Sequence, residues 1–385
     1  MEALSHLPTL RLKPGKRCRA AGGHPWVFAG EVAELPPSSL DGGAALCRDA
    51  RGRLLGTGIV NTRSQIIWRK FSSRAEAWDE AALARRLAAA LDRRGKARVA
   101  RLVWSESDGI PGLTVDRFGD VLVGQALTRA VEDRRGWIGA QLLAATGAAA
   151  LVWRDEAPVR AKEGLEVREA SSSVEPFWLE IDGVEFRIDP SGGQKTGFYL
   201  DQRGQYLRVA ALARGRRVLD CFCNQGGFAL HAMKAGAASA VGVDASASAV
   251  ASGREAARRN GVSVEFIEAN VFDYLKTLPA ERFDLIVLDP PPFAPGKDRV
   301  AGALRGYKEI NLRALKALPP GGILATYACS HHIGHEVFQA MLAESAQDAG
   351  RTLRLLEIAR QPEDHPVMFH FPESEYLRGF VVEAG

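Results

Sequence analysis

The sequence predicts a multi-domain α/β protein, in which an N-terminal β-barrel, a small α+β domain and a C-terminal doubly wound domain follow one another. Three observations support this class. The length of 385 residues corresponds to two or three domains of roughly 150 residues each. Short β-type runs broken by turn residues fill the first fifth of the chain, and strand and helix patterns alternate over its second half.

Residues 1–75 are expected to form the β-barrel. Runs such as Trp26-Val27-Phe28 and Ile66-Ile67 alternate with turns rich in Gly and Pro. This segment holds 12 Lys and Arg against 5 Asp and Glu, a balance of +7, whereas the whole chain carries +4. A compact basic module suggests a polyanion partner. Solvated surface charge explains such a balance equally well.

Residues 76–188 are expected to form the small middle domain. The stretch 79–94 predicts a helix, because a capping Asp79 precedes a run of Ala, Leu and Arg. Two β runs on either side of Gly119-Asp120 predict a hairpin, and a second helix is expected near 132–146. The polar stretch 155–176 predicts a loop or linker. A further hairpin over 177–188 is expected to turn at Asp182-Gly183.

Residues 189–385 alternate buried-strand runs with helical stretches, which predicts a parallel doubly wound sheet. The strands are expected at 217–221, 240–243, 264–267, 283–288 and 322–328. The helices between them are expected at 226–235, 246–260 and 306–317. At the end of the chain, the runs 367–371 and 376–382 predict an antiparallel hairpin added to that sheet.

Composition and cysteine usage exclude several classes. A chain with 46% hydrophobic and 25% charged residues is not largely disordered. No apolar run approaches the ~20 residues that span a bilayer, and the first residues contain no apolar core of a signal peptide. Five cysteines without a CxxC motif argue against disulfides and zinc fingers, so no metal and a cytoplasmic location are expected.

Polar residues at successive strand ends predict the cofactor. One apolar strand ends in Asp220, and its loop enters a helix through Gly226 and Gly227, where backbone can approach a ligand closely. The next strand ends in Asp244, an acid that can hold both hydroxyls of a ribose. The third leads to Asn270, followed by a backbone amide that can read an adenine edge. One such Asp is often only a helix cap, but the ordered set without a GxGxxG loop favours S-adenosylmethionine over NAD.

Two further features bear on the chemistry. Asp289 opens an Asp-Pro-Pro-Pro-Phe run that resembles the Asp-Pro-Pro-aromatic motif of amino-methylating enzymes, although Phe293 is displaced by one position. Cys329 directly follows an apolar strand, so it is expected at the ligand-binding edge of the sheet. A thiolate that adds to carbon 6 of cytosine makes carbon 5 nucleophilic. A Cys is more often a small buried hydrophobe, which is our interpretation of Cys18 and Cys47.

Three stretches resemble a known family. They are 12–17 with 23–32, the Ser-Gly-Gly-Gln-Lys-Thr-Gly-Phe-Tyr-Leu-Asp-Gln-Arg segment 191–203, and the cofactor series together with Cys329-Ser330. On these, essentially the whole chain resembles the class I large-subunit (23S) ribosomal RNA cytosine-5 methyltransferases that carry an N-terminal PUA domain. The resemblance implies a PUA domain over 1–75, a small α/β domain over 76–188 and a Rossmann-like methyltransferase domain over 189–385.

The resemblance also implies roles for individual residues. S-adenosylmethionine is the expected cofactor and large-subunit ribosomal RNA, free or in an assembly intermediate, the expected partner. Cys329 is the expected nucleophile and Asp289 a candidate proton acceptor. The expected RNA-binding residues are Lys13, Lys16, Arg17 and an exposed Trp26. The segment 194–203 is implied to fold over the cofactor. The expected cofactor-binding residues are Phe198, Tyr199, Asp201, Arg203, Asp220, Phe222, Gly226, Gly227, Asp244, Ala245, Asn270, Val271, Asp289 and Pro290.

The chain departs from the family in two places, and alternatives stay open. Pro291 or Pro292 stands where many such enzymes have a second Cys, and Asn270 stands where an Asp is usual. Asp201 could instead cap a helix beginning near Arg203 and pair with that residue. The alternatives to cytosine-5 chemistry are a methyltransferase for guanine N2 or adenine N6, and a non-catalytic RNA-binding assembly factor. Some members of the family are implied to be homodimers.

Overall fold

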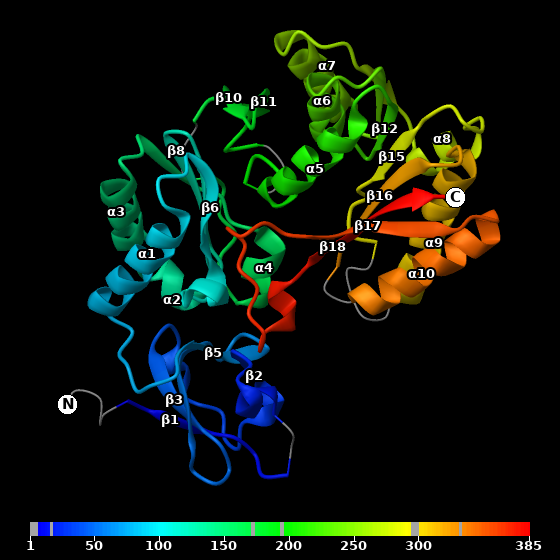
Figure 1. The fold of residues 1–385 in the computed structure, drawn as a ribbon. Coiled ribbons are helices and arrows are strands. Elements are labelled where there is room, and N and C mark those ends of the chain that lie inside the picture. Colours follow the sequence, from blue (N-terminus) through cyan, green and yellow to red (C-terminus); the bar gives the residue numbers. More distant parts are fainter. Residues whose placement is uncertain (1–6, 16–17, 171–173, 193–195, 294–299, 331–332) are drawn as a thin grey trace. The chain divides into compact units, whose positions relative to one another are not determined.

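The computed structural model describes residues 7–15, 18–170, 174–192, 196–293, 300–330 and 333–385 (Figure 1). Contacts divide the chain into two compact units. The first unit contains 1–177, 188–200 and 363–374, and the second contains 178–187, 201–362 and 375–385. None of the helices in the described parts of the chain has the length and apolar character needed to cross a membrane.

The first unit begins with a five-stranded sheet in the order β1-β3-β4-β5-β2. Its strands are β1 (Thr9–Arg11), β2 (Trp26–Phe28), β3 (Ala44–Arg48), β4 (Leu54–Val60) and β5 (Ile66–Ser72). The pairing is antiparallel except between β1 and β3. Cys18 and Cys47 lie in the core with the fully buried Trp68, whose indole N–H donates to the Ala45 carbonyl at 2.9 Å. The predicted β-rich module and its two core cysteines are confirmed.

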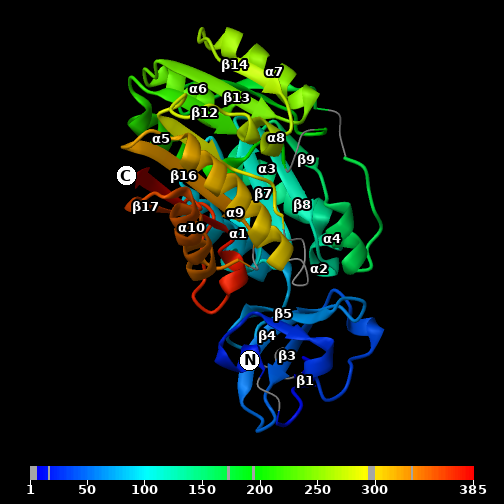
Figure 2. The same cartoon turned by 90° about the vertical axis from the view of Figure 1, so that its right-hand side faces the viewer.

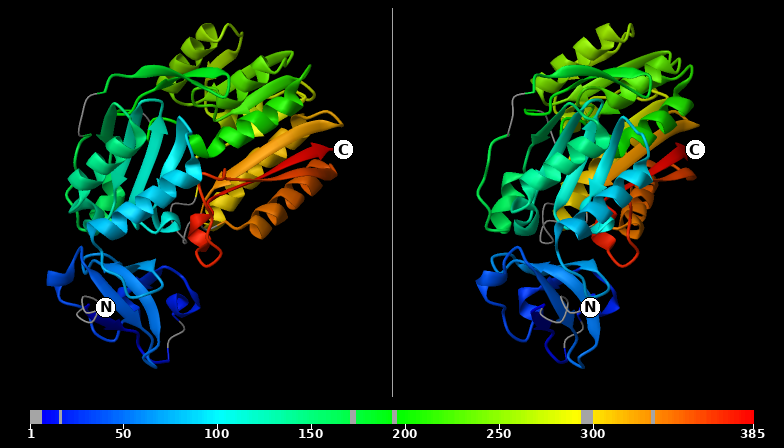
Figure 3. Two further views of the ribbon diagram at one scale, coloured as in Figure 1. Left: turned by 60° about the vertical axis from the view of Figure 1, so that its left-hand side comes forward. Right: turned by 90° about the vertical axis from the view of Figure 1, so that its left-hand side faces the viewer.

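A four-stranded sheet in the order β6-β7-β8-β9 follows in the same unit. Its strands are β6 (Val99–Trp104), β7 (Leu113–Phe118), β8 (Val121–Ala126) and β9 (Ala150–Trp153). The helices α1 (Glu80–Arg94) and α3 (Arg135–Thr146) pack against it, and α2 (Arg129–Glu132) follows β8 (Figure 3). As predicted, the Asp79 carboxylate caps α1 by accepting from the Ala82 amide at 2.8 Å, and β7 and β8 form the hairpin.

The polar stretch 155–176 is not wholly a loop, because α4 (Ala157–Lys162) lies within it. Arg160 on this helix is only 1% exposed, and its guanidinium donates to Glu132 Oε2 at 2.8 Å and pairs with Asp155. The contact with Glu132, which lies outside the stretch, holds the helix in place. Polar composition therefore misled the prediction, since two of its charged residues, Arg160 and Glu163, are buried.

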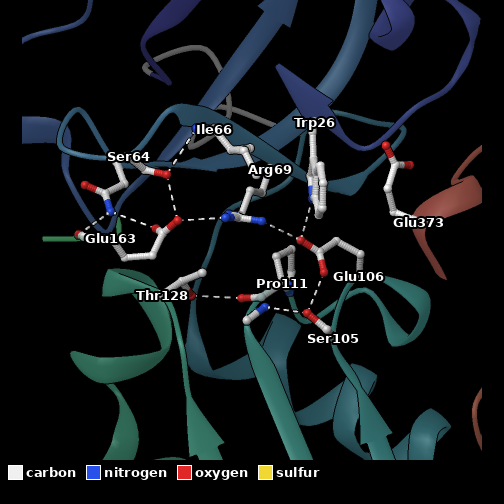
Figure 4. A network of polar contacts seen from close by, with 12 residues as sticks. Trp26, Ser64, Ile66, Arg69, Ser105, Glu106, Pro111, Thr128, Glu163 and Glu373 are labelled. Atoms are coloured by element: carbon white, nitrogen blue, oxygen red, sulfur yellow. Dashed lines mark hydrogen bonds and ion pairs between the residues drawn. The ribbon is translucent and has the colours of Figure 1, made fainter. Parts of the chain in front are cut away.

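A buried polar network joins the two sheets of the first unit (Figure 4). Arg69 on β5 donates to Glu106 Oε1 at 3.0 Å and to Glu163 Oε1 at 2.7 Å. Glu106 lies in the short 3-10 helix η5 (Ser105–Asp108), and Glu163 follows α4. The indole of Trp26 donates to the same Glu106 oxygen at 2.7 Å.

The second unit is built on a seven-stranded sheet in the order β14-β13-β12-β15-β16-β18-β17 (Figure 2). Its strands are β12 (Arg217–Cys221), β13 (Ser239–Asp244), β14 (Glu265–Glu268), β15 (Leu285–Leu288), β16 (Gly322–Cys329), β17 (Leu353–Arg360) and β18 (Leu377–Ala384). The first five strands are parallel, as predicted. A separate hairpin, β10 (Phe177–Ile181) with β11 (Val184–Ile188), turns at Asp182-Gly183 as expected.

Helices cover both faces of this sheet. On one face, α6 (Gly227–Lys234) packs on β12 and β13, and α7 (Ala247–Arg259) packs on β13 and β14. The helix α5 (Arg203–Ala213) packs against α6. A second group of helices shares a core with the opposite face, and contains α8 (Val271–Lys276), α9 (Val300–Ala317) and α10 (His335–Ala349). Both faces of the central strands are therefore buried, which explains their unbroken apolar sequences.

The predicted final hairpin is wrong in one of its strands. β18 pairs with β17, whereas the run 367–371 lies outside the sheet in a segment, 363–374, that belongs to the first unit. The buried aromatic residue of that run contacts the N-terminal sheet instead. Phe371 packs edge-on against Trp26, with ring centroids 4.8 Å apart.

Candidate active site

The register of the seven-stranded sheet places Asp220, Asp244, Asp289 and Cys329 on one face. Asp220 on β12 pairs with Gly242 on β13, two positions before Asp244, and with Val287 on β15, two positions before Asp289. Val287 pairs in turn with Ala325 on β16, four positions before Cys329. Since side chains alternate along a strand, all four point to the side that α5, α6 and α7 cover. They gather at the carboxyl edge of the parallel strands, where ligands bind in such sheets.

Asp220 is fully buried, and only one of its two carboxylate oxygens has a hydrogen-bond partner in the described parts of the chain. Its Oδ2 accepts from the Ala229 amide at 3.0 Å, whereas Oδ1 has no hydrogen-bond partner among the described residues. Burial raises the pKa of this carboxyl to about 8, and the neighbouring Asp289 and Asp244 add to the rise. A buried acceptor without a partner is costly. The ammonium of S-adenosylmethionine is the kind of cation that this oxygen lacks, so the residues present fit the expected cofactor.

The two glycines of the loop are needed by the protein itself. Gly226 adopts a left-handed conformation, with φ +82°, and a Cβ there would lie 2.6 Å from the Phe266 ring. A Cβ on Gly227 would lie 2.6 Å from the Tyr206 ring. Close packing of these two aromatic rings therefore requires the glycines, and access for a ligand is not their only explanation.

Asp244 and Asn270 organise the next two loops. Asp244 accepts from the Asn224 amide through Oδ2 and from the Ser246 amide through Oδ1, both at 2.9 Å. Each oxygen keeps a second lone pair for a ribose hydroxyl. Asn270 is exposed and caps α8, because its Oδ1 accepts from the Phe272 amide at 2.9 Å. Ala245 is exposed beside this loop, and Val271, the first residue of α8, is buried.

Asp289 has a partner that sequence reasoning missed. The side-chain amide of Gln202 donates to Asp289 Oδ1 at 2.8 Å. Gln202 is only 2% exposed and lies immediately before α5. The two residues are 87 positions apart, so no local pattern indicates the contact. It fixes the carboxylate at the edge of the sheet, directly before the buried Pro290.

The segment predicted to fold over the cofactor divides between the two units. Phe198 is buried and Tyr199 half-buried in the first unit, and their stacking role stays a prediction. In the second unit, Asp201 accepts from the Tyr376 hydroxyl at 2.8 Å. Arg203 pairs with Asp182 at 2.7 Å, and α5 has no side-chain cap. Helix capping by Asp201 is therefore the wrong alternative.

Cys329 ends β16 and is the most accessible of the five cysteines. It is half-buried, whereas the other four are buried. The residue after it, Ser330, is held by Arg378, whose guanidinium donates to the Ser330 carbonyl at 2.9 Å and to the Glu375 carbonyl at 2.8 Å. Arg378 is only 6% exposed. The buried guanidinium of Arg378 therefore fixes the backbone next to Cys329, where β16 ends.

We expect iodoacetamide at about pH 8 to alkylate Cys329 at least ~10-fold faster than any other cysteine. The physical reason is access together with ionisation: burial raises the pKa of Cys18 to about 11 and that of Cys47 to about 12, and holds Cys221 and Cys223 well above the ordinary thiol pKa. Peptide mass mapping measures the order. Unfolded protein should label at all five sites, and first labelling at a buried cysteine would contradict the structure.

The aromatic ring of the Asp-Pro-Pro-Pro-Phe run lies inside an aromatic cluster. Phe293 packs against Tyr307 of α9, with centroids 4.7 Å apart, and against Phe272 at 5.8 Å. Phe222, an expected cofactor contact, is half-buried in the same cluster, 6.3 Å from Phe293. The ring that an amino-methylating enzyme would stack on its base is therefore half-buried and packed against other aromatic side chains.

The expectation of an exposed Trp26 is wrong. Its indole N–H is bound to Glu106, its ring packs on Phe371, and the Arg69 guanidinium carbon lies 5.2 Å from the ring centroid. An indole N–H seeks an acceptor when it is buried, and this acceptor lies 80 residues away. Lys13 is exposed, with its Nζ donating to the Gly30 carbonyl at 3.2 Å.

Two other expected RNA contacts, Lys16 and Arg17, lie outside the described residues. Of the three histidines after Cys329, two are also outside them, and His335 is the first residue of α10. No group of three or more His, Cys, Asp or Glu suited to a metal ion is found in the part of the chain that the structure describes.

Comparison with known proteins agrees with this geometry. Residues 123–371 match the S-adenosylmethionine-dependent methyltransferase family, and residues 10–73 match a PUA-like domain. Ribosomal RNA large subunit methyltransferase I of Shewanella denitrificans is 39% identical over 97% of this chain and 98% of its own. The protein of the same name from Aeromonas hydrophila is 38% identical over 94% and 95%. The crystal structure of SMU.776 complexed with SAH shares the fold, with a TM-score of 0.83 at 18% identity over 98% and 100%.

Proposed function

The chain belongs to the S-adenosylmethionine-dependent methyltransferase family that includes the ribosomal RNA large subunit methyltransferases I, and from this premise we propose that it methylates carbon 5 of a cytosine in large-subunit ribosomal RNA. One observation carries the proposal. Cys329 is the most accessible thiol of the chain and lies on the same sheet face as the three cofactor-edge aspartates.

Asp220, Asp244 and the loops that they anchor would hold the cofactor. Asp220 would accept from its ammonium and Asp244 from its ribose hydroxyls, while the amide of Val271 would donate to the adenine edge. When bound, S-adenosylmethionine supplies an electrophilic methyl group on a sulfonium. The protein must then make carbon 5 of cytosine nucleophilic, because this carbon reacts poorly on its own.

Cys329 would provide that activation. Its thiolate forms a bond from Sγ to carbon 6, and the electron pair of the 5,6 double bond becomes available at carbon 5. Once carbon 5 carries the methyl group, a base removes its proton, the double bond re-forms and the thiolate leaves. Asp289, held by Gln202 at 2.8 Å, is our candidate for this base.

Amino-group methylation is less well supported. It would need Phe293 to stack on a flipped base, but this ring packs against Tyr307 and Phe272. A purely non-catalytic role would leave the unpartnered oxygen of the buried Asp220 without purpose. We propose that the PUA-like domain positions the RNA, with Lys13 among its phosphate contacts.

The test is a trapping assay with large-subunit ribosomal RNA containing 5-fluorocytidine. Fluorine at carbon 5 cannot leave as a proton does, so the covalent Cys329 adduct should persist under denaturing conditions in the presence of S-adenosylmethionine. Cys329→Ala should form no adduct, and its methyl transfer to normal RNA should fall by roughly 1000-fold or more.

Cys18→Ala serves as the matched control, because it removes a thiol from the N-terminal core and should trap like the wild type. Methyl transfer that survives in Cys329→Ala, without any adduct in the wild type, would overturn cytosine-5 chemistry. The position of the methyl group in digested RNA would then show whether an exocyclic amine is the target.

A further inference from the structure

One aromatic side chain is presented to solvent at the tip of the segment 363–374. Phe369 is 101% exposed, and among the described residues no other Phe, Tyr or Trp is in the exposed class. It occupies, together with His370, the centre of a turn closed by a bridge between Met368 and Phe371. Exposed aliphatic residues are common on protein surfaces, but a fully exposed Phe at a turn apex is not explained by the core.

The turn behind Phe369 is rigidly held. The Phe371 amide donates to the Met368 carbonyl at 2.9 Å, and the Met368 amide donates to Ser374 Oγ at 2.8 Å. Phe371 itself is 5% exposed and packs on Trp26 and on His24, with centroids 4.8 and 5.4 Å apart. Because the backbone is fixed on both sides, binding at Phe369 would require little ordering of the chain.

The surroundings of the turn carry exposed guanidinium groups. The His370 ring packs against Gly23, where a Cβ would lie 3.1 Å from it, directly after the 3-10 helix η2 (Arg19–Gly22). Arg19 pairs with Glu373 at 2.6 Å, and the side chain of Arg19 is 48% exposed against 25% for Glu373. The cation therefore lies on the outer side of this pair.

Arg53 repeats this arrangement. It donates to the Ala21 carbonyl of η2 at 3.4 Å and pairs with Asp49 at 3.1 Å. The side chain of Arg53 is 64% exposed against 18% for Asp49. In both pairs near this turn the guanidinium is thus more exposed than the acid that it pairs with, in a domain whose sequence has a balance of +7.

We propose that Phe369 is a stacking platform for an unpaired base of the RNA, with Arg19 and Arg53 on the flanking phosphates. Sites for single-stranded nucleic acid combine an aromatic platform with cations that follow the backbone, and this is the combination that the turn and η2 provide. The two guanidinium groups, each more exposed than its acidic partner, favour a polyanion over a protein partner. The inference rests on the proposed function in one respect: it takes RNA as the substrate.

The experiment measures the affinity of the full chain for a labelled RNA of mixed sequence, once single-stranded and once annealed to its complement. Phe369→Ala should weaken single-strand binding roughly 5- to 100-fold, as expected for the loss of one stacked base. Duplex binding should not change, because its bases are already stacked. The slope of affinity against salt should also be unchanged, since no phosphate contact is lost.

Two matched variants sharpen the result. Val367→Ala removes an exposed apolar side chain from the same segment and should bind like the wild type, whereas Phe369→Trp should retain the affinity. Equal binding by Phe369→Ala and wild type, equal loss on single strand and duplex, or no single-strand binding by the wild type would each overturn the platform. The 5-fluorocytidine adduct at saturating RNA does not depend on Phe369, so a failure of cytosine-5 chemistry appears in that separate assay.

Discussion

Asp220→Asn should make the protein without cofactor more stable at pH 8 and should weaken its binding of S-adenosylmethionine by about 10- to 100-fold. The two effects have one cause. The carboxyl is fully buried, its Oδ1 has no partner among the described residues, and burial raises its pKa to about 8. An asparagine amide does not ionise, so it has no cost of burying a charge. It also offers the cofactor ammonium no negative charge.

The sign of the pH dependence follows from the raised pKa. Between about pH 4 and pH 8 the unfolded chain has lost the Asp220 proton while the folded chain keeps it, so the free energy of unfolding falls as pH rises. The slope is at most about 1.4 kcal/mol per pH unit for one proton. Asp220→Asn should lack this component, be close to wild type near pH 4, and exceed it by several kcal/mol near pH 8.

Urea unfolding at a series of pH values, with and without S-adenosylmethionine, measures both effects. Wild-type binding should release a proton below pH 8, so cofactor affinity should rise with pH up to that value. Asp273→Asn, which neutralises a carboxylate with a 71% exposed side chain, is the matched control and should leave both profiles unchanged. If Asp220→Asn binds the cofactor as tightly as the wild type, Asp220 does not bind the cofactor ammonium.

Much of the fold could be predicted because its signals are local. The four central parallel strands of the second unit, β12, β13, β15 and β16, are largely buried and so appear as short apolar runs. The strand β17 (Leu353–Arg360) escaped prediction because it is an edge strand with exposed side chains, among them Leu355 and Ile358. The run 367–371 misled because Phe371 packs on Trp26 of the N-terminal sheet while Val367 and Phe369 are exposed, and no periodicity reveals this.

The candidate site divides in the same way. The aspartates at strand ends could be predicted, because position in a parallel sheet determines where they gather. Gln202, which holds Asp289, and Arg378, which holds the loop after Cys329, could not, since each contact joins segments that lie far apart in the sequence. The same limit explains why the expectation of an exposed Trp26 was wrong. Its residue type in a basic segment indicated an RNA contact, and only the fold reveals that Glu106 binds its N–H.

Arg69→Met should be among the most destabilising single changes in the first unit, with an expected loss of about 3–5 kcal/mol. The Arg69 side chain is only 12% exposed and is the ion-pair partner of Glu106 and Glu163, whose side chains are 5% and 4% exposed. Burial alone would raise the pKa of Glu106, but Arg69, with donors from Ser105 and Trp26, holds it below its ordinary value. Methionine fills similar space and leaves two buried carboxylates without a cation.

The pH dependence separates this mechanism from a simple packing defect. In the wild type the lowered pKa of Glu106 means that its contribution to stability is lost as pH falls through that pKa. In Arg69→Met the uncompensated Glu106 carboxylate should have a raised pKa, because burial then dominates, so the variant should instead gain stability as pH falls from 7 towards the ordinary carboxyl pKa of about 4.3. Urea unfolding across this range measures the difference.

Glu106→Gln and Glu163→Gln added to Arg69→Met should restore much of the lost free energy of unfolding, because no buried charge then remains. Arg53→Met, which breaks an exposed pair with Asp49, should change the free energy of unfolding by at most about 1 kcal/mol. An Arg69→Met variant that unfolds like Arg53→Met would show that the network in Figure 4 does not stabilise the junction of the two sheets.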